Sequence, residues 1–491
     1  MLKRSIIFVH RWLGVVLCLF FLLWFPSGIG MMYWDFPSVE AGDRLERSPS
    51  LEASTIRLSP AEAYIFTGLS QPPSQVRLNT FAGRPIYRFR ADTTTSLVYA
   101  DNGARQTGVM NDLADRIASS WVGQPVGAAT RETLDDADQW TVQGSFRAQR
   151  PLLKYSWPNG EQVYVSPASG EVVQYTTAAS RLGAYLGPIP HWIYFTPLRK
   201  HQLAWDRVVT WSSGIGTFAA LLGIVAGVWM FSPAKRYRFD GAPARIPYRG
   251  QKRWHTVFGL IFGLGAVTWV FSGMLSMDPF PAMSQRPRSD IPRALHGRLE
   301  LPAFAARDPR EALAQLSGLR VKELELTMVA GEPVYLATLA RGETRIVPVA
   351  GPPREAFDGQ SIIRLIESAS QPVGLAEARV IDRYDVYYLD RHKLRPLPVI
   401  LARLNDAEHT RYYIDPKTAR LVGSYSSKTW MSRWLYHGLH SLDFPWLYDY
   451  RPIWDFVVIT FMLGGTALGV TSLILAWRVI GSYLLRTQSS T

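Results

Sequence analysis

Residues 433–445 read R-W-L-Y-H-G-L-H-S-L-D-F-P, residues 451–455 read R-P-I-W-D, and an uncharged run follows from Phe456 to Trp477. His437 and His440 are three residues apart, so on an α-helix they project from one face. That helix leads directly into a run of membrane-spanning length. The pattern therefore places imidazoles at the edge of a bilayer, where they either bind a metal or a haem or make interfacial hydrogen bonds.

Four uncharged runs of this kind occur in the chain, at residues 12–33, 208–232, 256–277 and 456–477. A hydrocarbon core of roughly 30 Å needs about 20 helical residues, so each run can span once. The first run is too long for a removable signal peptide and lacks a clear small-residue cleavage site, so we interpret it as a retained anchor. The remaining sequence is polar and is expected to fold in water.

The net charge of +13 is concentrated on one side of these predicted spans. Basic residues precede the first span, crowd the link between the second and third, and follow the fourth: Lys3, Arg4, Arg11, Lys235, Arg236, Arg238, Arg245, Arg249, Lys252, Arg253, Arg478 and Arg486. By the positive-inside rule, both termini and this link are cytoplasmic, and the two long segments lie on the other side. The charge thus indicates membrane lipid rather than nucleic acid as the partner.

Cysteine usage restricts the possible cofactor chemistry. Cys18 is the only cysteine and lies inside the first predicted span. The external segments therefore have no disulfides, and the chain has no C-x-x-C-H site for covalent haem attachment. Any haem in this protein is expected to be b-type.

The first span superposes on the third without a gap. The matched residues are His10 with His255, Gly14 with Gly259, Trp24 with Trp269, and Ser27-Gly28 with Ser272-Gly273. Each histidine has a glycine one helical turn further on, and the missing side chain leaves room for a flat macrocycle against the helix. The alternatives are close helix packing for the glycines and lipid headgroup contact for the histidines.

The second span superposes on the fourth in the same way. Trp205-Asp206 matches Trp454-Asp455, and the same register matches His191 with His440. Both histidines fall at the external ends of their spans. The chain is therefore interpreted as a duplicated unit, in which each half has a histidine at the inward end of one span and another at the outward end of the next.

The external segments repeat a helix-then-strands pattern. Ser59, Pro60 and Glu62 predict a capped helix start, and Asp308 with Pro309 predicts another. Short strands rich in Val, Tyr and Leu follow each helix, and a second set of strands comes later in each half. The predicted fold class is an α+β membrane protein, with a four-helix transmembrane bundle and two external domains of helix-plus-antiparallel-sheet modules.

These patterns divide the chain into segments. The predicted segments are 1–34 (tail and first span), 35–190 (first external domain), 191–232 (interfacial helix and second span), 233–254 (basic loop), 255–277 (third span), 278–430 (second external domain), 431–478 (interfacial helix and fourth span) and 479–491 (cytoplasmic tail).

Several motifs resemble the PepSY-associated transmembrane family of bacterial inner-membrane proteins. They are H-R-W-L-G from His10, V-Y-V-S-P-A-S-G-E-V-V from Val163, I-P-H-W-I-Y-F from Ile189, R-Y-Y-I-D-P-K-T-A-R-L-V from Arg411, and the stretch from Arg433 quoted above. The resemblance implies PepSY modules that face the periplasm above a helical bundle. It also implies a function, since characterised relatives carry b-type haems and pass electrons to ferric siderophores, while others are described only as iron-regulated membrane proteins. Relatives with a reductase role are shorter, so the substrate does not carry over.

The leading hypothesis is a transmembrane electron conduit with two b-type haems. His10 and His255 are the predicted axial ligands of an inner haem, and His191 and His440 those of an outer haem. Two histidines fill both axial positions of the iron, which favours electron transfer over oxygen chemistry. Two further histidines are reserve candidates for the outer site, namely His201 and His437.

The electron donor is expected to be a cytoplasmic reductant or a membrane quinol, because no strand is followed by a G-x-G-x-x-G motif for a dinucleotide. The expected acceptor is a ferric siderophore or another periplasmic ferric chelate. His296, His392 and His409 lie in predicted external loops and are expected to be solvated.

A different class of function is a non-enzymatic membrane protein whose PepSY modules bind or regulate a periplasmic peptidase or cell-envelope partner. In that case the spans only anchor the protein, and it carries no haem. A metal-ion transporter is disfavoured, because no acidic residue lies inside any predicted span. Hydrolytic chemistry is unsupported, since no H-E-x-x-H spacing occurs.

Overall fold

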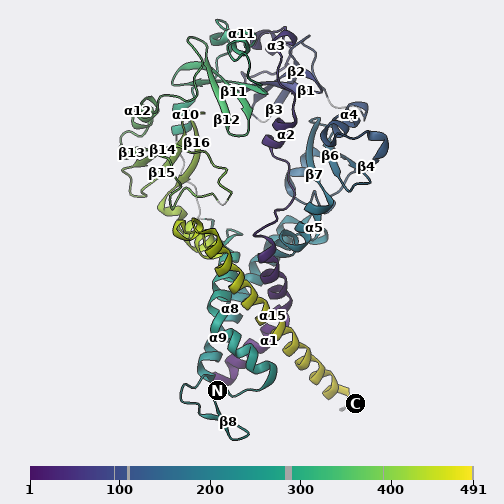
Figure 1. The fold of residues 1–491 in the computed structure, drawn as a ribbon, viewed down its shortest axis with the longest axis vertical. Helices are drawn as coiled ribbons and strands as arrows, with labels where there is room; N and C mark the ends of the chain where they lie inside the picture. Colours follow the sequence, from purple (N-terminus) through teal and green to yellow (C-terminus); the bar gives the residue numbers. More distant parts are fainter. Residues whose placement is uncertain (93, 108–110, 282–289, 391, 489–491) are drawn as a thin grey trace.

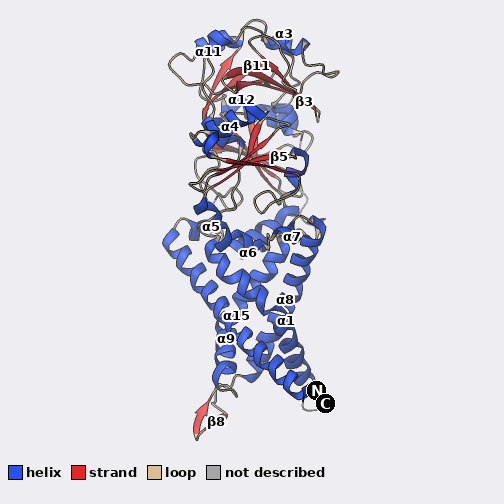
Figure 2. Cartoon of the chain, turned by 90° about the vertical axis from the view of Figure 1, so that its right-hand side faces the viewer, coloured by secondary structure: helices blue, strands red, loops and turns tan. Residues whose placement is uncertain are grey.

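The computed structural model describes residues 1–92, 94–107, 111–281, 290–390 and 392–488. A head of β-sheets and short helices lies on top of a bundle of long helices (Figures 1 and 2). The N-terminus and the last described residue, Gln488, lie at the end of the bundle that is distant from the head (Figure 1). The two predicted external domains, at 35–190 and 278–430, and the predicted tail at 479–491 each include residues outside the described ranges.

The bundle consists of four helices: α1 (Leu2–Gly30), α8 (Gln202–Met230), α9 (Gly250–Leu275) and α15 (Arg451–Gln488). Each is long and apolar enough to cross a membrane, which confirms the four predicted spans. Large apolar side chains are exposed on its surface, including Trp211 at 68% and Leu264 at 70%. Such a surface is stable in contact with lipid rather than water. The chain is therefore a membrane protein.

The link between α8 and α9 forms a small hairpin of β8 (Tyr237–Phe239) and β9 (Ala242–Ala244). It lies beyond the bundle at the same end as the termini (Figure 2). The basic residues of this link and of the N-terminus are therefore on one side of the bundle.

The top of the head is a six-stranded antiparallel sheet in the order β12-β11-β10-β1-β2-β3. Its strands are β1 (Gln75–Phe81), β2 (Arg84–Ala91), β3 (Thr94–Tyr99), β10 (Glu323–Val329), β11 (Glu332–Ala340) and β12 (Glu343–Pro348). β1 and β10 pair directly, with Val76 opposite Leu326 and Leu78 opposite Leu324. The first sheet modules of the two halves are thus joined, which the division into two external domains did not predict.

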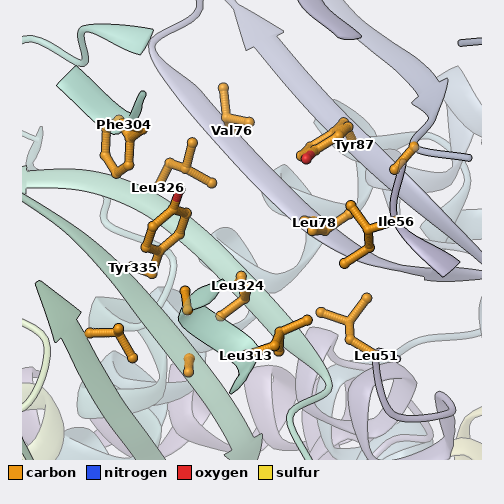
Figure 3. Close-up of a cluster of buried hydrophobic side chains, with 14 of the residues drawn as sticks. Leu51, Ile56, Val76, Leu78, Tyr87, Phe304, Leu313, Leu324, Leu326 and Tyr335 are labelled. Atoms are coloured by element: carbon orange, nitrogen blue, oxygen red, sulfur yellow. The ribbon is translucent and has the colours of Figure 1, made fainter. Parts of the chain in front are cut away.

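One hydrophobic core lies on this joined sheet. Leu78 and Tyr335 are fully buried in it and come from different halves of the chain (Figure 3). Two short helices, α3 (Pro60–Ile65) and α11 (Pro309–Ala314), begin at the predicted caps. Ser59 and Glu62 form a capping box, and the Asp308 carboxylate accepts the Arg310 backbone N–H at 2.8 Å.

Two four-stranded antiparallel sheets lie between the six-stranded sheet and the bundle (Figure 1). One contains β4 (Thr130–Leu134), β5 (Leu152–Ser156), β6 (Gln162–Ser166) and β7 (Glu171–Thr176). The other contains β13 (Leu375–Ile381), β14 (Val399–Leu404), β15 (Arg411–Asp415) and β16 (Arg420–Tyr425). Each follows sequence order, so each half supplies one hairpin-connected sheet close to the bundle.

Short helices connect these sheets to the bundle and cover them. They are α2 (Ala41–Arg47), α4 (Asn111–Val122), α5 (Ala178–Leu186), α6 (Pro188–Trp192), α7 (Thr196–Arg199), α10 (Ile291–Leu295), α12 (Gly359–Ala369), a π-helix at Met431–Gly438, α13 (Leu439–Ser441) and α14 (Pro445–Tyr448). The segments α5–α6 and π-helix–α13 bring the predicted external histidines onto the head end of the bundle.

Candidate functional site

The first site is a pair of histidines at the end of the bundle distant from the head, here called the far pair. His10 on α1 and His255 on α9 have imidazole centroids 6.1 Å apart, with the ring planes at 34°. The other two helices supply their hydrogen-bond partners. His10 Nδ1 lies 2.9 Å from the Ala219 carbonyl oxygen on α8, and His255 Nδ1 lies 3.1 Å from Thr471 Oγ1 on α15.

A cavity of about 280 Å³ surrounds the far pair. Gly14 and Gly259 line it, and a Cβ added at Gly14 would meet no atom within 4 Å. The space that the sequence predicted beside each histidine is therefore present. Arg11 and Lys252 also line this cavity.

Gly223 on α8 fixes the position of His10. A Cβ at Gly223 would lie 2.6 Å from His10 Cε1, closer than two carbon atoms can pack. Only glycine therefore allows the His10 ring to lie against α8 in this orientation. Sequence reasoning missed Gly223, because it compared the first span only with the third.

The second site is a pair of histidines at the head end of the bundle, here called the head-side pair. His191 on α6 and His440 on α13 have imidazole centroids 5.9 Å apart, with the ring planes at 62°. A cavity of about 250 Å³ surrounds them and is lined mainly by aromatic residues, among them Trp24 and Trp269.

The two halves of the chain hold the head-side histidines with matching contacts. His191 Nδ1 lies 3.2 Å from Ser27 Oγ, and His440 Nδ1 lies 3.1 Å from Ser272 Oγ. The serines are the residues that the sequence alignment of the first and third spans paired. Each histidine is followed closely by a residue in left-handed conformation, Ile193 and Leu442 respectively, which turns the chain back towards the bundle.

The indole of a tryptophan fastens each of these turns. Trp205 Nε1–H donates to the Trp192 carbonyl at 2.7 Å, and Trp454 Nε1–H donates to the Ser441 carbonyl at 3.0 Å. These residues are equivalent in the register that matches His191 with His440. The matching geometry explains why tryptophan and histidine recur at this spacing in the sequence.

Backbone carbonyls indicate the tautomer of one imidazole in each pair. His10 Nδ1 lies 2.9 Å from the Ala219 carbonyl oxygen, and His191 Nδ1 lies 3.1 Å from the Trp24 carbonyl oxygen. A carbonyl oxygen only accepts, so both rings carry a proton on Nδ1 and leave the Nε2 lone pair available. The other two rings have hydroxyl partners that accept in the same way when they donate to carbonyls of their own helices. Metal-binding histidines typically donate their second ring N–H in this way.

The spacing of each pair fits one metal ion between the rings. Imidazoles on opposite sides of a metal, with metal–nitrogen bonds of roughly 2.0–2.1 Å, have centroids roughly 6 Å apart. The two observed separations are 6.1 Å and 5.9 Å. Within the described residues, no three or more His, Cys, Asp or Glu side chains gather to hold a metal. A macrocycle that brings its own equatorial ligands fits this donor set.

Aromatic contacts join the two cavities. Phe21 on α1 lines the far cavity, and its ring centroid lies 6.3 Å from Trp24 and 5.8 Å from Phe25. Trp24 and Phe25 line the head-side cavity. Ser27 follows His10 by about 17 residues of helix, so the two pairs lie roughly 26 Å apart along α1.

The two reserve histidines lie outside both cavities. His201 is exposed at the start of α8 and lines neither cavity. His437 is also exposed and lines a separate polar cleft. The prediction that His437 and His440 share one α-helical face is wrong, because residues 431–438 form a π-helix, whose wider turn separates them.

The predictions for the loop histidines are confirmed in two cases and wrong in one. His392 and His409 are exposed. His296 is half-buried between the sheets, with Nδ1 at 3.1 Å from Thr327 Oγ1 and Nε2 at 3.0 Å from the Ala419 carbonyl. Burial lowers the pKa of His296, while the hydrogen bond to the Ala419 carbonyl acts in the opposite direction.

Comparison with known proteins agrees with the fold and with the sequence motifs. The family model described as PepSY-associated TM region matches residues 7–318, which is more than half of the chain. No curated protein matches the chain. The matched segment contains most of α1 and all of α8 and α9, together with His10, His191 and His255. The chain belongs to the PepSY-associated transmembrane family.

Proposed function

We propose that this protein transfers electrons across a bacterial inner membrane through two b-type haems and reduces a ferric siderophore or another ferric chelate in the periplasm. The observation that carries this proposal is the presence of two histidine pairs, one at each end of the bundle, with ring centroids 6.1 Å and 5.9 Å apart; each pair would hold one haem. Haem bound at each pair would supply a one-electron redox couple.

The orientation follows from charge. The basic hairpin link and both termini lie at the far end of the bundle, so the positive-inside rule makes this end cytoplasmic. The head and the head-side pair then face the periplasm. On this reading, electrons from a cytoplasmic reductant or quinol enter near His10 and His255 and leave near His191 and His440.

An internal duplication accounts for the two sites. Each half of the chain supplies one histidine to each pair, together with equivalent serine and tryptophan partners for the head-side pair. Two copies of one unit, related by an approximate twofold axis through the bundle, generate this arrangement. The pairing of β1 with β10 in the head is consistent with the same axis.

The protein's own residues have three roles in this mechanism. The carbonyl and hydroxyl acceptors lie beside Nδ1 of each imidazole, so Nε2 points away from them. These hydrogen bonds also make each imidazole a stronger ligand. Arg11 and Lys252 are positioned to pair with carboxylates of a group bound in the far cavity. Phe21, Trp24 and Phe25 exclude water from the space between the cavities.

The experiment measures electron transfer across a liposome membrane, from a reductant outside to ferric iron inside. Purified protein is reconstituted into liposomes that enclose ferric citrate and a ferrous-iron indicator, and a reductant that cannot cross lipid is added outside. We expect indicator colour only in liposomes that contain the protein, and its loss in the variant His10→Ala/His255→Ala. Equal reduction with and without the histidines would refute the proposal. A colourless protein whose cellular role survives loss of the histidines would instead favour the regulatory alternative.

A further inference from the structure

A polar cleft of about 410 Å³ lies next to the head-side cavity, between the sheet β13–β16 and the π-helix. Its lining includes Tyr387, Arg395, Tyr425 and His437. Its volume is within the range of roughly 300–1,000 Å³ that is typical of small-molecule sites. None of the residues assigned to the two histidine pairs lines it.

Two adjacent rings of the π-helix connect this cleft with the head-side pair. Tyr436 lines the head-side cavity, and its ring centroid lies 5.6 Å from His440. The ring of His437 lies 4.6 Å from Tyr436 and lines the cleft. A molecule in the cleft would therefore be separated from the head-side pair by one layer of side chains. π-helical turns are rare and often occur at functional sites.

Arg395 gives the cleft a positive charge that no ion pair among the described residues neutralises. Arg395 is exposed and forms no ion pair with any residue that the structure describes. Arg433 is neutralised by Asp443, whose carboxylate accepts from it at 2.7 Å. The rings of Tyr387 and Tyr425 also line the cleft, with centroids 4.0 Å apart and planes tilted by 32°.

Only the second half of the chain has this arrangement. In the register that matches His191 with His440, Tyr436 and His437 correspond to Gly187 and Pro188. The structure supports this register, because the left-handed residues Ile193 and Leu442 also match. The first half thus lacks both rings that connect the head-side pair with a cleft. Both halves hold the head-side pair with equivalent contacts, but only the second half connects that pair with a cleft through two rings.

Another basic cleft, of about 610 Å³, lies higher in the head, and glutamates pair with three of the five arginines that line it. Arg44 and Arg88 pair with Glu171 at 3.5 Å and 2.8 Å, and Arg77 approaches Glu323 at 3.7 Å. It also has no ring contact with either histidine pair among those the structure describes. The cleft at Arg395 is the better acceptor site.

We propose that the cleft at Arg395 and His437 binds the terminal electron acceptor, and that this acceptor is a compact ferric chelate of net negative charge. This inference rests on the proposed function. One electron from the donor converts the bound ferric ion to ferrous, and no bond to the protein forms. A quinol donor supplies two electrons and would therefore reduce two ferric ions. Arg395 attracts the anionic chelate, and the aromatic side chains that line the cleft contact its organic ligand.

The test measures binding without electron transfer. Gallium(III) citrate, a redox-inert analogue of ferric citrate, is titrated calorimetrically into the purified full-length protein. We expect saturable binding, weakened about tenfold or more by Arg395→Glu and less by Arg395→Gln. Arg320→Glu is the matched control, because Arg320 is exposed in the head and no ion pair of it is described. We expect this control to bind within about twofold of the parent.

Three results would overturn the inference: no binding to the parent protein, equal binding by Arg395→Glu, or equal loss in Arg320→Glu. Equally strong binding of a cationic gallium tris-hydroxamate would refute the anionic class. Haem content measured on the same samples separates the two proposals. A colourless protein with Arg395-dependent binding would refute the electron conduit and leave an anion site, whereas a haem protein without binding would refute the cleft alone.

Discussion

The substitution Gly223→Ala is expected to remove the far haem and leave the head-side haem in place. The added Cβ would lie 2.6 Å from His10 Cε1, whereas carbon atoms pack at about 3.5–4.0 Å. The His10 ring must therefore move by roughly 1 Å, and metal–ligand distances tolerate changes of only about 0.2 Å. A single methyl group thus prevents ligation by His10.

Haem content per chain, measured by the pyridine haemochrome assay, is expected to fall from two to one. Overpacking is also expected to destabilise the bundle by about 1–3 kcal/mol. The control is Gly214→Ala on the same helix, where the new Cβ would lie 3.3 Å from the flexible Met274 side chain. Two retained haems with an unchanged spectrum in Gly223→Ala would refute the reasoning, and loss of haem in the control would indicate general damage to the bundle.

Three further predictions concern separate parts of the molecule. Ser27→Ala/Ser272→Ala removes a hydroxyl acceptor from each head-side imidazole, so the basicity of both ligands falls. The midpoint potential of the head-side haem is therefore expected to rise in a spectroelectrochemical titration, while that of the far haem stays unchanged. An unshifted potential would show that these hydrogen bonds do not tune the site. The folded-state pKa of His296 is lowered by burial, so the unfolded chain binds that proton more tightly, and the stability of the head is expected to decrease as pH falls from 6.5 towards the folded-state value. His296→Gln should reduce this slope in thermal unfolding at pH 7.5 and 5.5, and an identical slope would contradict the assignment. Leu78→Ala, at a fully buried position of the joined sheet, is expected to cost about 2–5 kcal/mol of unfolding free energy in a denaturant titration, and an unchanged midpoint would argue against the shared core.

Sequence patterns alone predicted the spans and the grouping of histidines at their ends. A run of about 20 uncharged residues is expected to cross a bilayer as an α-helix. The register between the two halves matched His10 with His255 and His191 with His440. The structure brings the members of each matched couple together. Whether they bind haem is a prediction for experiment.

Other features depended on information that local patterns do not contain. Apolar and polar residues alternate along Gln75–Phe81 as in any half-buried strand. Neither this segment nor Glu323–Val329 therefore predicts that the two strands pair. The π-helix separates His437 from His440, and three-residue spacing assumes α-helical geometry. His296 was assigned to a solvated loop because its partners, Thr327 and Ala419, are distant in sequence.

The most direct test of the account is haem stoichiometry combined with low-temperature electron paramagnetic resonance of the oxidised, purified protein. We expect two low-spin b-type haems per chain, with one lost in His10→Ala/His255→Ala and the other lost in His191→Ala/His440→Ala. A protein without haem, or one whose haem signals survive both double substitutions, would contradict it.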